Sequence, residues 1–155
     1  MLPSCLLARA PFFCLLATCG LSLAARPAHA QNRVANYSCG QPGTAAYEHF
    51  SFWTNDQQRT DIQYAYGKNR TDVRPRYAGP GRLQGQPCFK VQFARRTLYL
   101  RPSGTTLLVA ASATAPPKTF TWEYEGPVNG VGTVCSMCAP SAAAAMRLVQ
   151  RHYLR

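Results

Sequence analysis

The chain has 155 residues, of which 46% are hydrophobic and only 15% charged, and its formal net charge is +11. This length favours a single domain. The apolar and aromatic content excludes a wholly disordered chain, because such chains have too little apolar surface to bury. The positive charge favours an acidic or phosphate-bearing partner, or it serves solubility alone.

The first thirty residues have the composition of a secretory signal peptide. Arg9 is followed by sixteen uncharged residues, Ala10 to Ala25, a run shorter than the ~20 apolar residues that span a bilayer. Because Ala28-His29-Ala30 offers small residues for a signal peptidase, we expect cleavage after Ala30. The mature protein is then periplasmic or secreted, without a transmembrane segment. Lipoprotein processing at Cys19 is the alternative.

Residues 31–155 predict one β-rich domain, because apolar and polar residues alternate in several short runs. The runs 89–93 and 97–101 flank a tight turn near Ala94-Arg95 and predict a hairpin. The run 119–125 predicts a strand with its three aromatic side chains inward. Together with candidate strands near 37–39, 48–53, 61–66, 105–111 and 131–134, these patterns predict a small antiparallel barrel or sandwich of about six or seven short strands.

The end of the chain changes to a helical period, and we expect a C-terminal helix at 140–155. Four consecutive alanines favour a helix, and Pro140 suits the first helical position. The apolar residues of this segment recur at intervals of three and four and predict one buried stripe. Its arginines recur at intervals of four and predict an exposed cationic stripe. The first set is Met146, Val149 and Tyr153, and the second is Arg147, Arg151 and Arg155.

The segment Gly67 to Pro87 contains seven Gly and Pro residues and predicts an irregular loop. It lies in the strongly basic stretch from Arg59 to Arg101. Arginine offers a planar fork that matches phosphate and carboxylate groups. We therefore predict that this loop binds an anionic ligand: a glycan, a lipid head group, an acidic protein surface or a nucleic acid. The predicted ligand-binding residues are Lys68, Arg70, Arg74, Arg76, Tyr77 and Arg82.

Signal cleavage would leave four of the seven cysteines: Cys39, Cys88, Cys135 and Cys138. An even number in an oxidising compartment predicts disulfides, with three possible pairings. A Cys39–Cys88 bond would close a loop of about 50 residues and stabilise the fold by roughly 4 kcal/mol. The alternative is that Cys135-Ser136-Met137-Cys138 is a redox or copper-handling motif.

Motifs of catalysis and of cofactor binding are missing from the sequence. It contains no Gly-rich phosphate loop, no His-Glu-x-x-His and no Gly-x-Ser-x-Gly. His49 is typical of a half-buried sheet residue, and His152 lies near the chain end, so we assign no catalytic residue, no metal ligand and no cofactor. The sequence favours a non-catalytic, disulfide-bonded binding module. A small thiol–disulfide or copper-handling protein that uses Cys135 and Cys138 is the alternative.

Overall fold

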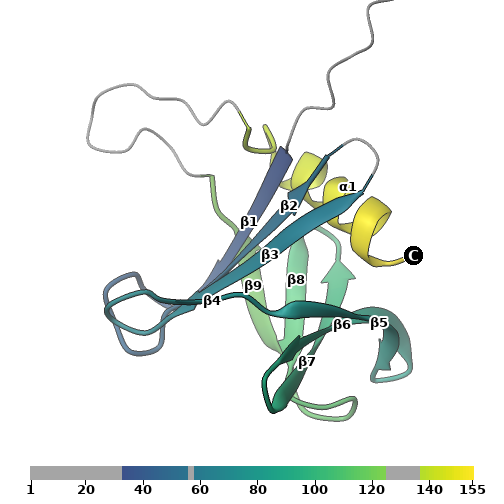
Figure 1. Cartoon of the computed structure of the whole chain (residues 1–155), viewed down its shortest axis with the longest axis horizontal. Coiled ribbons are helices and arrows are strands. Elements are labelled where there is room, and N and C mark those ends of the chain that lie inside the picture. Colours follow the sequence, from purple (N-terminus) through teal and green to yellow (C-terminus); the bar gives the residue numbers. More distant parts are fainter. Residues whose placement is uncertain (1–32, 56–57, 125–136) are drawn as a thin grey trace, which may run out of the picture.

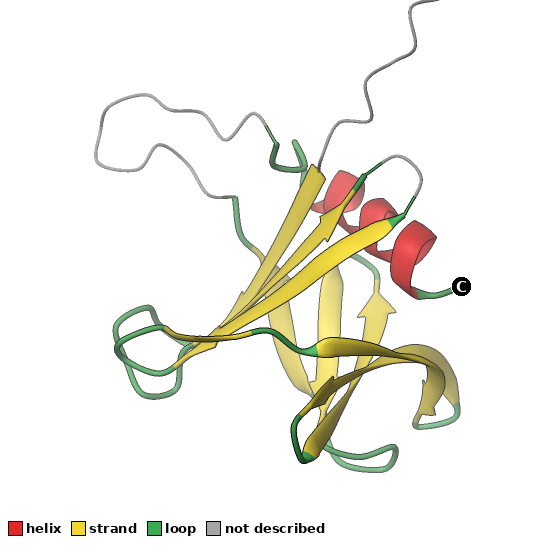
Figure 2. Ribbon diagram, in the orientation of Figure 1, coloured by secondary structure: helices red, strands yellow, loops and turns green. Residues whose placement is uncertain are grey.

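The computed structural model describes residues 33–55, 58–124 and 137–155, which form one antiparallel sheet and a C-terminal helix (Figure 1). The described elements are β1 (Arg33–Cys39), β2 (Glu48–Thr54), β3 (Arg59–Tyr66), β4 (Thr71–Val73), β5 (Arg76–Leu83), β6 (Gln86–Phe93), β7 (Arg96–Ser103), β8 (Thr106–Ala110), β9 (Lys118–Trp122) and α1 (Ala142–Tyr153). The strands pair in the order β4-β3-β2-β1-β9-β8-β7-β6-β5. Figure 2 shows the sheet curled into a half-barrel with α1 across one end. The mainly β class with a C-terminal helix is confirmed.

The strand count is higher than predicted, because β4 and β5 lie in the segment that we expected to be an irregular loop. β5 is an edge strand that pairs with β6 alone. Pro80 has no N–H to donate, and this is tolerated because no second strand lies beside β5 to accept a hydrogen bond. Gln84 and Gly85 both have positive φ (53° and 77°), as in a tight two-residue hairpin turn. Gly and Pro therefore shape an edge strand and its turn here.

The inward-facing side chains of the half-barrel form the main core. Phe50 and Phe52 of β2 are fully buried, as are Phe89 of β6 and Phe120 of β9. The ring centroid of Phe52 lies 5.8 Å from that of Phe89, and that of Phe50 lies 5.5 Å from that of Phe120. The Phe52–Phe89 contact joins strands that are distant in the sheet order, and so it helps to hold the sheet in its curled shape.

Helix α1 packs its apolar stripe against the main core. The buried residues are Ala145, Met146, Val149 and Tyr153, which confirms the predicted stripe. The helix begins at Ala142, after an N-cap in which the Ser141 side chain accepts a hydrogen bond from the Ala144 N–H (3.2 Å). Pro140 therefore precedes the N-cap, and the prediction that it occupies the first helical position is wrong.

The predicted hairpin is confirmed, because β6 and β7 pair across a two-residue turn at Ala94-Arg95. The predicted strand 119–125 is shorter than expected: β9 ends at Trp122, and Tyr124 is 41% exposed. The pairing of β9 with β1 extends only to Trp122. Tyr124 therefore lies beyond the paired part of the strand, and no strand pairing directs its side chain toward the core. The candidate strand 131–134 lies outside the described residues. No helix in the described part of the chain is long and apolar enough to cross a membrane.

Candidate anion-binding surface

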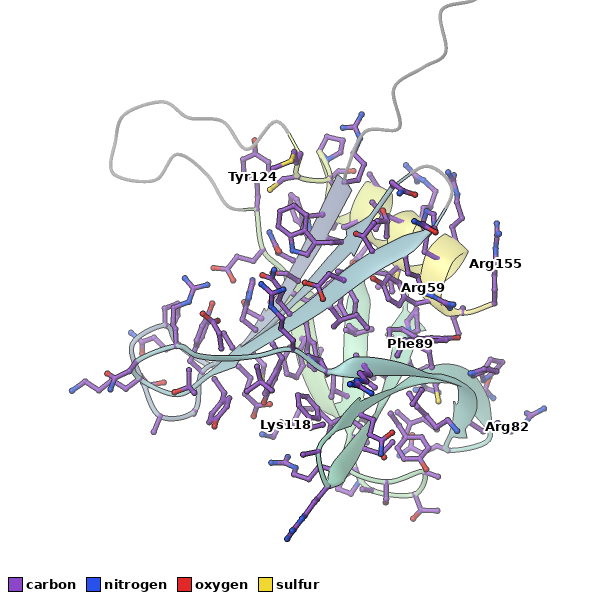
Figure 3. All side chains as sticks on the ribbon, viewed as in Figure 1. Arg59, Arg82, Phe89, Lys118, Tyr124 and Arg155 are labelled. Carbon is purple, nitrogen blue, oxygen red and sulfur yellow. The ribbon has the colours of Figure 1, made fainter. Side chains whose placement is uncertain are left out.

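The six residues predicted to bind an anion lie on separate parts of the sheet, because the segment that carries them is not one loop. They occupy the turn after β3 (Lys68 and Arg70), the link after β4 (Arg74) and the edge strand β5 (Arg76, Tyr77 and Arg82). Figure 3 shows Arg82 on the β5 edge, away from Arg59 and Arg155 near the end of α1. These cations do not form one recognition loop.

Several of these predicted residues contact neighbours within the protein. The guanidinium of Arg70 lies 5.8 Å from the ring centroid of Tyr47. Nη1 of Arg74 lies 3.6 Å from Oδ2 of Asp61, and Nη1 of Arg82 donates a hydrogen bond to the Gly85 carbonyl (2.8 Å). Each of these three arginines therefore has an interaction partner within the protein.

A different set of basic residues lies along α1. Its members come from β1, β3, the helix and the residue Arg155 beyond the helix end, and these parts are far apart in the sequence. Arg147, Arg151 and Arg155 are exposed, as the predicted cationic stripe requires. We call this set the α1 cationic surface: Arg33, Arg59, Arg147, Arg151, His152 and Arg155.

Arg59 is held in place by two neighbouring elements. Its guanidinium carbon lies 3.8 Å from the ring centroid of Tyr77, a cation–π contact with β5. Its Nη1 donates a hydrogen bond to the His152 carbonyl (3.3 Å), and the Tyr77 hydroxyl donates one to the Arg155 carbonyl (3.2 Å). These contacts fix β3 and β5 to the end of α1, and they place Tyr77 beside the surface.

Two shallow cavities lie along the α1 cationic surface. One, of about 310 Å³, has Arg33, Arg147 and Arg151 in its wall, and the other, of about 330 Å³, has Arg59, Arg151 and Arg155. Arg151 borders both, so the two cavities are adjacent. No acidic residue lines either cavity among the described residues, and the described chain offers no ion-pair partner to Arg147, Arg151 or Arg155. The guanidinium groups of Arg147, Arg151 and Arg155 can therefore receive a carboxylate, sulfate or phosphate group.

Part of this positive charge also serves the helix. Arg151 and His152 lie in the last turn of α1, where the helix dipole is negative. Each cation there stabilises a helix by about 0.3–1 kcal/mol. This effect does not extend to Arg33 or Arg59, which belong to strands. Arg59 is instead held by Tyr77 and the His152 carbonyl, as described above.

The described cysteines do not form the expected disulfides of Cys39 and Cys88. Both residues are free thiols. Cys39 packs beside the main core and Cys88 lies in a second cluster with Leu83 and Ala110, so the curled sheet keeps them in different places. Burial raises the pKa of the Cys88 thiol. Cys135 lies outside the described residues.

The described residues contain no cluster of three His, Cys, Asp or Glu side chains that could hold a metal ion. His49 is 4% exposed and lies on the sheet face opposite Phe50, and it is therefore more buried than the half-buried position we predicted. It lines a polar cavity of about 380 Å³ with Ser51, Trp53 and Arg70.

Comparison with known proteins gave no match: no family model, curated protein or solved structure matches the chain. The assignment of a site therefore depends on its geometry alone.

Proposed function

We propose that this protein is a non-catalytic binding module that holds an anionic ligand on the α1 cationic surface. The observation that carries the proposal is that the exposed Arg147, Arg151 and Arg155 have no ion-pair partner among the described residues and border two cavities whose described lining contains no acidic residue. The ligand class stays the one expected from the sequence: an anionic glycan, a lipid head group, an acidic protein surface or a nucleic acid. The recognition surface moves from the predicted loop to the end of α1.

The proposal is tested by removing charge from this surface alone. In the triple variant Arg147→Gln, Arg151→Gln, Arg155→Gln, we expect affinity for heparin, a sulfated polysaccharide, to fall at least about tenfold, since several charge-assisted hydrogen bonds are lost. The dependence of affinity on salt should also weaken, because fewer counterions are released. Both are measured by titration at several salt concentrations.

The control removes three charges elsewhere. The variant Lys68→Gln, Arg70→Gln, Arg82→Gln has the same net charge as the first, but its substitutions lie outside the α1 cationic surface. We expect it to keep most of the heparin affinity. Equal losses in the two triple variants would show that only net charge matters and would overturn the proposal. Circular dichroism confirms that each variant is folded.

We also propose that the protein is exported, with the signal peptide removed after Ala30, and that Cys138 is bonded to Cys135. Cys39 and Cys88 are free thiols, so among the four cysteines after Ala30 only Cys135 is left to pair with Cys138. Its segment is tied to β1, because Val34 N–H donates to the Met137 carbonyl and Ala139 N–H to the Val34 carbonyl (both 2.9 Å). Since Cys138 is only 7% exposed, this bond fits a structural role better than rapid exchange.

The cysteine proposal predicts a single disulfide in the exported protein. Proteolysis and mass mapping without reductant should give one cross-linked pair of peptides, which carries Cys135 and Cys138. Cys88 should react with iodoacetamide only after unfolding, because it is 1% exposed. A cross-link from Cys138 to Cys39 or Cys88 would contradict the proposal, as would free thiols at Cys135 and Cys138.

A further inference from the structure

A second concave site lies on the part of the half-barrel that α1 does not cover. Two cavities, of about 290 and 400 Å³, share Tyr64, Tyr66 and Arg96 in their walls, and no residue of α1 lines either. Tyr64 and Tyr66 belong to β3, and Arg96 begins β7. We call this continuous site the open groove. The larger apolar side chains in its wall are Tyr64, Tyr66, Val73, Phe93, Leu98 and Val109.

The open groove is apolar because inward-facing side chains of the sheet continue beyond the helix. The ring centroids of Tyr64 and Phe93 lie 5.2 Å apart in an edge-on contact, and those of Tyr64 and Tyr66 lie 5.7 Å apart in a stacked one. Tyr66 is 44% exposed, so an aromatic face is left open to solvent. Concave, mostly apolar sites with a few polar groups are typical of small-molecule binding.

The charged residues around the open groove favour a ligand of negative charge. Glu48 is already occupied, because it pairs with Lys118 and accepts a hydrogen bond from the Tyr64 hydroxyl (2.8 Å). Arg96 is exposed and has no ion-pair partner among the described residues. The charge left unbalanced in the wall is therefore positive, and it stands at the end of an aromatic surface.

We propose that the open groove binds an amphipathic carboxylate, with its apolar body on the Tyr64, Tyr66 and Phe93 rings and its carboxylate on Arg96. A guanidinium pairs with a carboxylate through two parallel hydrogen bonds, and the aromatic wall removes apolar surface from water. The site is separate from the α1 cationic surface, with which it shares no lining residue. It is therefore tested independently of the proposed function.

The test compares three probes with the same ten-carbon chain: decanoate, decanol and decylamine. In a ¹H–¹⁵N NMR titration of the full chain, we expect decanoate to bind about tenfold more tightly than decanol, and decylamine to bind most weakly. The perturbed amides should lie along the open groove. Equal binding of decanoate and decanol would overturn the proposal, as would perturbations confined to the α1 cationic surface.

Two variants separate the charge from the apolar wall. Arg96→Gln should remove the preference for decanoate over decanol, whereas Tyr66→Ala should weaken both probes alike. Arg95→Gln is the matched control: Arg95 is the exposed neighbour in the same turn but lines neither cavity, so the preference should persist. An Arg96→Gln protein that is folded and keeps the full preference for decanoate would exclude Arg96 as the carboxylate partner.

Discussion

Replacement of Tyr153 by alanine is expected to lower the free energy of unfolding by about 4 kcal/mol, within the 3–5 kcal/mol typical of large aromatic truncations. The side chain is fully buried, and its ring centroid lies 5.3 Å from that of Phe52 and 5.5 Å from that of Phe89. It therefore joins α1 to both β2 and β6. The loss is a large part of the ~5–15 kcal/mol that stabilises a typical domain.

Two milder variants show how the effect arises. The Tyr153 hydroxyl lies 3.0 Å from the Trp53 carbonyl and 2.9 Å from the Asp61 carbonyl, and either carbonyl can accept a hydrogen bond from it. Tyr153→Phe keeps the ring and should cost only about 1–2 kcal/mol. Gln150→Ala, an exposed change on the same helix, should cost less than about 0.5 kcal/mol. Urea unfolding followed by tryptophan fluorescence measures all three. A loss below about 1 kcal/mol for Tyr153→Ala would show that this side chain does not anchor the helix.

Stability is expected to fall steeply at alkaline pH, because three tyrosines that stay protonated in the folded protein lose their protons when the chain unfolds. Burial is the main cause that raises the pKa of Tyr37, Tyr64 and Tyr153 well above the usual value near 10, since a phenolate is poorly solvated in the core. Above pH ~10 the unfolded chain binds fewer protons than the folded protein. Their stabilisation is therefore complete below pH ~10 and declines as the pH rises toward the folded-state pKa.

Each of these tyrosines contributes a slope of about 1.4 kcal/mol per pH unit, so three give about 4 kcal/mol per unit at pH 11 and above. Urea unfolding at pH 8 to 11.5 measures this slope, and absorbance of the phenolate near 295 nm reports the ionisation itself. A stability that stays constant up to pH 11.5 would contradict the burial of these groups.

Tyr37→Phe is a specific control for this slope. The Tyr37 hydroxyl is buried without a hydrogen-bond partner in the described structure. Its removal should reduce the alkaline slope by about one third, yet leave stability at pH 7 unchanged or up to about 1 kcal/mol higher, because no hydrogen bond is lost. Removal of the hydroxyl from Tyr153, in Tyr153→Phe, is instead expected to destabilise the protein at pH 7, because that hydroxyl is hydrogen-bonded. The pair thus distinguishes an unpartnered buried hydroxyl from a bonded one.

The sequence predictions were accurate where they depend on residues close together in the chain, and less accurate where contacts with other strands decide the structure. The β6–β7 hairpin depends on alternation and a two-residue turn, and both are local. The buried stripe of α1 depends on the helical period, which is also local. By contrast, β5 contains Gly79, Pro80 and Gly81, which locally disfavour a strand. It forms because its neighbour β6 supplies a partner and because an edge strand tolerates proline.

The candidate site was partly visible in the sequence. The spacing of Arg147, Arg151 and Arg155 predicted a cationic helix face, and Tyr77 was predicted as a contact residue. No local pattern could relate these residues to Arg33 or Arg59, which lie on other elements. Lys68 lies in the turn between β3 and β4, whereas Arg82 lies on β5, and the two are separated because β4 and β5 stand at opposite ends of the strand order.

The sequence by itself determined the β-rich class, the central hairpin and the two opposite faces of the terminal helix, because strand and helix periods are written in neighbouring residues. Only the tertiary structure decided which basic residues form the α1 cationic surface and where the open groove lies. Those outcomes depend on how far the sheet curls and on which end of it α1 covers. Both are set by contacts between residues distant in the chain, such as Phe52 with Phe89 and Tyr153 with both.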